Sequence, residues 1–154
     1  MLCIKFKLLS IKIQNLKIWF IASLLILVSN CAGTGSKNIS TISIDEKIDK
    51  VGIYFSRPSA YYGGAVLGSI TVNGEKVGDI GDGEYIRHIV NPGSFSAKIE
   101  TGGLALGAIS ADSVAGTGKN GDKFFYIISI KPGFLSSDWK LTETTNLGFK
   151  QSQK

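Results

Sequence analysis

The sequence predicts an all-β fold, a small antiparallel β-sandwich that follows an apolar leader. From residue 50 onward, apolar and polar residues alternate along several short segments, and this is the period of a β-strand. Turn-forming residues recur between these segments at intervals typical of sandwiches and barrels. The 19 glycines argue against helices, which glycine destabilises, and no segment after residue 30 shows a convincing helical stripe.

The first expected strand covers 51–55. Val51, Ile53 and Phe55 point to one face of this segment, and Gly52 and Tyr54 point to the other. The apolar face predicts that the strand packs on a core.

The following segments are joined by recognisable turns. Asn73 and Gly74 predict a type I′ hairpin turn because both residues tolerate positive φ. Gly-Asp-Gly at 81–83 and Asn-Pro-Gly at 91–93 predict further turns. Strands are therefore expected in an antiparallel meander at 67–73, 75–80, 84–90 and 94–101, and further strands at 107–114, 123–131 and 138–144. The segment 123–131 has too many apolar residues for a strand with one face in solvent. This predicts a central strand that is covered on both faces.

Most of the net charge lies in the leader. The chain of 154 residues has a formal charge of +5, and its first 30 residues contain Lys5, Lys7, Lys12 and Lys17 but no acid. Removing these four from the 17 basic residues leaves 13 against 12 acidic residues, or about +1 for the rest. A nucleic-acid-binding domain keeps a basic patch in its folded part, so no nucleic-acid partner is expected.

The leader has the pattern of an export signal. Residues 18–28 form an uncharged, mostly apolar run of eleven after a basic stretch. A membrane-spanning helix needs about 20 apolar residues, whereas the centre of a signal peptide has about 7–15. Val28-Ser29-Asn30-Cys31 resembles the lipobox of bacterial lipoproteins, which implies cleavage after residue 30 and lipidation of Cys31. The alternative is an uncleaved membrane anchor in which Cys31 is incidental.

This resemblance implies a lipid-anchored protein of the cell envelope, with the membrane as partner through Cys31. Ala32 follows the cysteine, which favours the outer membrane by resemblance to a sorting rule of double-membrane bacteria. The expected organisation is a signal peptide at 1–30, a lipidated cysteine and flexible tether at 31–48, a β-sandwich domain at 49–146, and a tail at 147–154. The tether is expected because its sequence begins rich in Gly, Ser and Thr and lacks helical periodicity.

A strand ending in Arg-Pro occupies 51–60, a strand-and-turn pattern follows at 70–100, and an aromatic strand with Lys-Pro-Gly-Phe at 131–134 comes later. These segments resemble a family of bacterial lipoproteins with a domain of unknown function, DUF2846, over roughly 50–145. The resemblance implies a small β-sandwich on a lipid anchor and transfers no catalytic residue. The sequence departs from the family pattern at 93–95, where basic residues are more usual.

Arg57, Tyr61 and Tyr62 are the best candidates for a recognition patch. They lie beside Gly63 and Gly64 on a glycine-rich connection. Arginine and tyrosine are enriched among residues that dominate binding energies, and loops often carry binding functions. The alternative is structural, with Arg57 ending the first strand and Tyr61 covering the core.

Two other motifs give weak signals. His88 is the single histidine, so it cannot form a multi-histidine metal site, and no paired nucleophile accompanies it. We expect it to pack on a sheet face. Residues 116–121 read Gly-x-Gly-x-x-Gly, but nucleotide binding by that motif requires a following helix. A strand is expected there, so neither a nucleotide nor another cofactor is predicted.

Asp79, Asp82 and Glu84 surround two turn glycines. Their spacing differs from that of the twelve-residue calcium loop, so a solvated turn without a metal is expected. The favoured function is a non-enzymatic binding or structural module, with a possible envelope protein as partner. Two alternatives stay open: an envelope hydrolase that uses Asp79 and Asp82 in acid–base chemistry, and a surface protein without a dedicated ligand.

Overall fold

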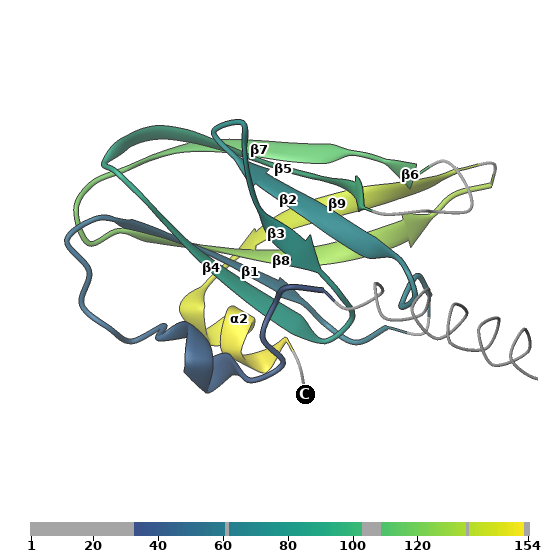
Figure 1. Ribbon diagram of the computed structural model, residues 1–154, viewed down its shortest axis with the longest axis horizontal. Coiled ribbons are helices and arrows are strands. Elements are labelled where there is room, and N and C mark those ends of the chain that lie inside the picture. Colours follow the sequence, from purple (N-terminus) through teal and green to yellow (C-terminus); the bar gives the residue numbers. More distant parts are fainter. Residues whose placement is uncertain (1–32, 61, 103–108, 135, 153–154) are drawn as a thin grey trace, which may run out of the picture. The chain divides into compact units, whose positions relative to one another are not determined.

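The computed structural model describes residues 33–152 apart from 61, 103–108 and 135. Most of the described chain is β-structure in two sheets, as Figure 1 shows. In chain order the elements are the 3₁₀ helix η1 (Ile39–Ile42), β1 (Val51–Arg57), β2 (Leu67–Val72), β3 (Glu75–Ile80), β4 (Glu84–Val90), β5 (Gly93–Gly102), β6 (Ile109–Ser110), β7 (Asp112–Gly118), β8 (Lys123–Pro132), β9 (Ser137–Thr144) and the helix α2 (Asn146–Gln151).

The two sheets have different strand directions. One has the order β3-β2-β5-β7 and is antiparallel throughout. The other has the order β4-β1-β8-β9-β6 and is mixed, because β1 is parallel to β8 and β6 is parallel to β9. The expectation of a purely antiparallel fold is therefore wrong for this sheet. Alternation reveals that a segment is a strand but not the direction of its neighbour.

The expected meander is also wrong beyond its first hairpin. β2 and β3 pair through the Asn73-Gly74 turn, in which φ is 53° and 83°, as the sequence predicts. After β3, however, the chain crosses to the other sheet, where β4 pairs with β1. It then crosses back, and β5 pairs with β2 and β7.

The two sheets share one hydrophobic core. Val51, Ile53 and Phe55 of β1 are fully buried in it, which confirms the predicted inward face. Trp139 is also fully buried there, and its Nε1 donates a hydrogen bond to Thr101 Oγ1 (3.1 Å). β8 lies between β1 and β9, so its prediction as a central strand is confirmed.

A second cluster covers the other face of the mixed sheet. Tyr54, Tyr85 and Phe125 project from its strands and pack with Ile42 and Ile44 of the preceding segment and with Phe149 of α2. Figure 1 shows η1 and α2 together beside β1 and β4. Large apolar side chains on a sheet face need such a cover.

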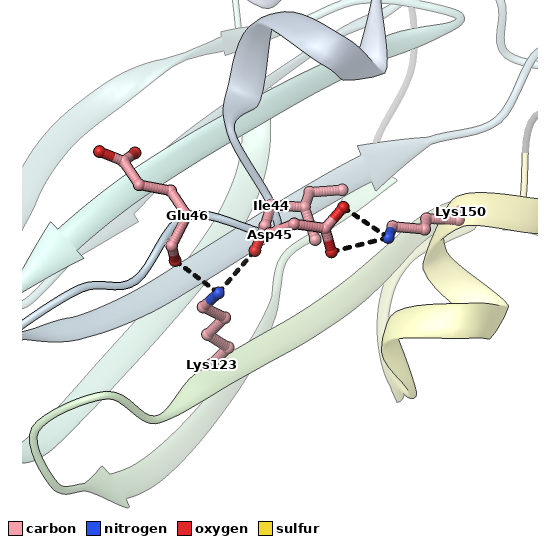
Figure 2. Close-up of polar contacts among 5 residues, drawn as sticks. All are labelled: Ile44, Asp45, Glu46, Lys123 and Lys150. Carbon is pink, nitrogen blue, oxygen red and sulfur yellow. Dashed lines mark hydrogen bonds and ion pairs between the residues drawn. The ribbon is translucent and has the colours of Figure 1, made fainter.

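The segment 33–48 differs from the flexible tether that its composition predicts. Ile42 and Ile44 are buried, and Ser36 forms a β-bridge with Tyr85. Lys123 Nζ donates hydrogen bonds to the carbonyl oxygens of Ile44 (2.6 Å) and Glu46 (2.7 Å), as Figure 2 shows. The segment is held because it supplies the apolar cover of the second cluster.

The predicted tail contains the helix α2. Thr145 caps it by accepting a hydrogen bond from the Gly148 amide (3.1 Å), and Phe149 is fully buried. Lys150 Nζ contacts both carboxylate oxygens of Asp45 at 2.8 and 2.9 Å (Figure 2). Both chain ends of the described domain are thus joined on one sheet face. Within these residues, no helix has the length and apolar character needed to cross a membrane.

Candidate functional site

The candidate residues lie near one end of the domain, which we call the loop end. It consists of the described residues of the connections 58–66, 81–83 and 133–136. Register places the first two connections together, because Arg57 at the end of β1 pairs with Glu84 and Gly68 of β2 pairs with Ile80. The third connection extends further along the sheet, because Ser56 pairs with Ile127 and β8 continues to Pro132. Pro132 and Ser137, which bound the third connection, pair with each other.

Arg57 supports the loop end from inside. It has the same strand parity as Val51, Ile53 and Phe55 and is only 3% exposed. Its guanidinium donates hydrogen bonds to the carbonyl oxygens of Val66, Gly63 (2.6 Å) and Ile80 (3.1 Å). These carbonyls belong to the 58–66 connection and to the end of β3, so Arg57 joins the two.

The charge of Arg57 is stabilised by its surroundings. The guanidinium carbon lies 5.0 Å from the centroid of a Trp139 ring, a cation–π distance. Burial lowers the pKa of Arg57, while the carboxylates of Asp82 and Glu84 act in the opposite direction. Buried charges are tolerated when their hydrogen-bonding groups have partners.

Asp82 closes the same loop from the other side. Its two carboxylate oxygens accept hydrogen bonds from Ser59 Oγ and from the Ala60 amide, both at 2.9 Å. The Gly83 amide donates to the Arg57 carbonyl (3.0 Å), and the φ of 72° at Gly83 favours glycine. These contacts hold the connections 58–66 and 81–83 against one another.

Tyr62 is the member of the predicted patch that reaches the surface. Half of its side chain is exposed, and its hydroxyl forms a 2.6 Å hydrogen bond with Ser137 Oγ at the start of β9. The adjoining Gly63 lies so close to Ile130 that an added Cβ would stand 2.6 Å from Ile130 Cδ1. Tyr61 lies outside the described residues. The structure therefore places Arg57 beneath the loop and Tyr62 on it.

Phe134 is a residue that the sequence reasoning missed. It lies in the turn between β8 and β9, and its side chain is fully exposed. The available signal was the uncharged sequence Pro-Gly-Phe-Leu at 132–135 between two predicted strands. A large apolar side chain fully in water is informative when other apolar groups lie near it.

The acidic residues considered for catalysis have separate structural partners. Asp79 Oδ2 accepts a hydrogen bond from Lys76 (2.9 Å), and the Asp79 backbone bonds with Thr34. Glu84 is buried and accepts from the Gly81 amide (2.8 Å). Among the described residues, no group of three or more His, Cys, Asp or Glu side chains is placed to hold a metal ion.

His88 lies on β4, the edge strand of the mixed sheet, and is partly buried. Burial lowers its pKa, and the negative charge of Glu75 opposes this effect. His88 lines a shallow depression of about 410 Å³ together with Thr34, Thr41, Val77 and Arg87. Neighbouring β4 residues also line this open surface.

A strand follows the Gly-x-Gly-x-x-Gly sequence, as predicted, but the strand expected at 107–114 is wrong, because β6 ends at Ser110 and β7 runs from Asp112 into the motif. Gly116 and Gly118 belong to β7, and Gly121 lies in the turn before β8 with a φ of 89°. A strand, not a helix, follows the motif. The amide-lined helix terminus that would bind a phosphate is therefore replaced by strand hydrogen bonding.

Cys31, the predicted lipidation site, lies outside the described residues. The described chain begins two residues later, at Gly33. No family model matches the chain, and no curated protein matches it.

Proposed function

We propose that this chain is a lipid-anchored lipoprotein of the cell envelope, held at the outer membrane by acyl chains on Cys31. Its β-sandwich domain acts as a non-enzymatic module that binds an envelope component. The proposal takes the lipobox-like sequence at 28–31 as the anchor signal. Two or more acyl chains hold a protein stably on a bilayer, whereas one chain does not.

The observation that carries the proposal is the position where the domain begins. Thr34 is fixed to β3: its amide donates to the Asp79 carbonyl (2.7 Å), and its hydroxyl oxygen accepts from the Asp79 amide (2.9 Å). The domain's fixed structure thus starts three residues after Cys31. A lipid on that cysteine would hold the module directly against its membrane.

The loop end supports a binding role. Tyr62 is an exposed aromatic side chain on a connection that Arg57, Asp82 and Ser137 hold in place, and Phe134 is a second one on the β8–β9 turn. Aromatic groups on a rigid surface bind at little entropic cost. Asp79 and Asp82, which the hydrolase alternative would require, instead contact Lys76 and the 58–66 connection.

Metabolic labelling with radiolabelled palmitate tests the anchor. We expect label in the wild type and in the matched control Cys3→Ala, since Cys3 is removed with the signal peptide. We expect none in Cys31→Ala. Equal labelling of all three proteins would contradict lipidation at Cys31.

In-cell cross-linking tests the binding role. Wild type and Cys31→Ala are cross-linked, purified and compared by mass spectrometry. We expect envelope components, lipid or protein, to be captured by the anchored form alone. Equal capture by both forms would show that anchoring does not determine what the module contacts.

A further inference from the structure

We infer that the loop end faces the lipid bilayer, with Phe134 inserted at the boundary between headgroups and acyl chains. The bilayer surface is then the envelope component that the module binds. This inference rests on the proposed lipidation of Cys31, and it adds the orientation of the domain and the residue that touches lipid.

The described chain enters the domain at the loop end. Gly33 lies against the turn of the loop end: a Cβ at this position would stand 2.6 Å from the Gly81 nitrogen and would also contact the Glu84 carboxylate. Thr34 then bonds to Asp79, and Ser36 bridges to Tyr85. The segment therefore starts at the 81–83 turn, and it reaches the other end of the domain at Ile48, whose carbonyl oxygen lies beside Gly121.

The chain between the proposed anchor and the domain is short. Cys31 and Gly33 are two residues apart, and two fully extended residues span about 7 Å. This is much shorter than β4, whose seven residues span about 23 Å between the two ends of the domain. An anchor on Cys31 therefore keeps the 81–83 turn close to the headgroups, and the domain cannot turn its opposite end to the membrane without releasing Thr34.

The chemistry of the loop end also favours contact with lipid. The connections 58–66 and 133–136 contain no Asp, Glu, Lys or Arg. Phe134 is fully exposed and Tyr62 half exposed, so an apolar and an amphipathic aromatic ring are both available to lipid. Asp82 is turned toward Ser59 and the Ala60 amide, and the charged residues that flank the 133–136 turn, Lys131 and Asp138, face each other across the β8–β9 pair. Little charge would therefore lose its hydration on contact with a bilayer.

The opposite end of the domain is polar and charged. Its turns include Asn73-Gly74 with Glu75 and Lys76 beside them, and the residues 119–122, Lys-Asn-Gly-Asp. Register places both turns at this end of the antiparallel sheet, since Val72 pairs with Ala97, and Gly118 pairs with Gly93, four residues earlier on β5. One end is thus suited to water and the other to the membrane interface.

Single-cysteine labelling tests this orientation on the lipidated protein. Lipidation consumes the Cys31 thiol and cleavage removes Cys3, so an introduced cysteine is the unique reactive thiol of the mature chain. Phe134→Cys places a nitrobenzoxadiazole fluorophore at the loop end. The matched control Asn120→Cys places it on an exposed turn at the opposite end. Both positions are exposed, so neither change removes a core contact.

Each labelled protein is added to preformed vesicles of phosphatidylethanolamine and phosphatidylglycerol, floated on a density gradient, and treated with dithionite. We expect blue-shifted emission at position 134 and reduction about tenfold slower than at position 120, the effect of burying one aromatic-sized group.

The outcomes separate this inference from the proposed function. Failure of both proteins to float with the vesicles would overturn the lipid anchor and, with it, the orientation. Flotation with equal reduction rates at the two positions would leave the anchor intact and overturn the orientation. Protection of position 134 in cell-derived membranes but not in pure lipid vesicles would show that the loop end binds a protein and would overturn lipid contact.

Discussion

Phe149 connects the end of the chain to the outer face of the mixed sheet, and replacing it with alanine tests this packing. The side chain is fully buried, with ring centroids at 5.3 Å from Phe125, 5.6 Å from Tyr85 and 6.3 Å from Tyr54. Truncation of a buried phenylalanine to alanine costs about 3–5 kcal/mol. Because α2 has six residues and can detach without leaving a closed cavity, we expect the lower limit, about 3 kcal/mol.

The assay is urea unfolding of residues 31–154 carrying Cys31→Ala. Trp139 is the single tryptophan of this segment and is fully buried, so its fluorescence reports unfolding. With a urea dependence of about 1.5 kcal/mol/M, the expected loss moves the midpoint by roughly 2 M. Leu147→Ala in the same helix is the control, because Leu147 is 65% exposed and should change stability by less than about 0.5 kcal/mol. A loss below about 1 kcal/mol for Phe149→Ala would refute the packing described for α2.

Three further changes probe other parts of the domain. Arg57→Met should lower the free energy of unfolding by about 3 kcal/mol, because one buried and two partly buried carbonyls lose their donor; Arg57→Lys should recover part of this loss, and equal stability of Arg57→Met and the wild type in urea would contradict this role. Gly68→Ala should cost about 1–3 kcal/mol, because its Cβ would lie 2.7 Å from Ile99 Cδ1; a double-mutant cycle with Ile99→Val should show relief, and simple additivity would argue against the clash. The hydrogen bond from Lys150 lowers the pKa of Asp45 below its ordinary 3.8, so this pair stabilises the fold above that pH and the contribution is lost as pH falls through the folded value. Carboxyl NMR titration should show the Asp45 pKa returning toward 3.8 in Lys150→Ala, and an unchanged titration would exclude the contact.

Strand positions were largely predictable from local pattern. The alternation at 51–55 and the apolar run at 123–131 reflect burial on one face and on two faces, and the Asn73-Gly74 turn reflects backbone freedom. Which strands pair with one another was not predictable, because the apolar pattern of β1 would suit several other strands as neighbours. The parallel β1–β8 pair depends on contacts across the whole chain.

The cover of the outer sheet face was not predictable from composition, because a few buried apolar residues in a polar segment provide it. The segment 33–48 is polar overall, but Ile42 and Ile44 are buried against an aromatic face that includes Tyr54 and Tyr85. These tyrosines occupy positions that alternate with core residues, so they signal a second covered face. In the same way, the parity of Arg57 with Phe55 predicts an inward arginine, whereas its residue type suggested a surface one.

The parallel pairing of β1 with β8 has a consequence for when the domain can form. Gly52 pairs with Lys123, 71 residues later, and Asp45 meets Lys150 across 105 residues. Bringing such distant residues together costs conformational entropy before the contacts can form. Long-range pairing of this kind makes folding slow. The mixed sheet therefore cannot be completed until almost the entire chain has been synthesised. For an exported chain, as proposed here, slow folding favours passage through a membrane in the unfolded state.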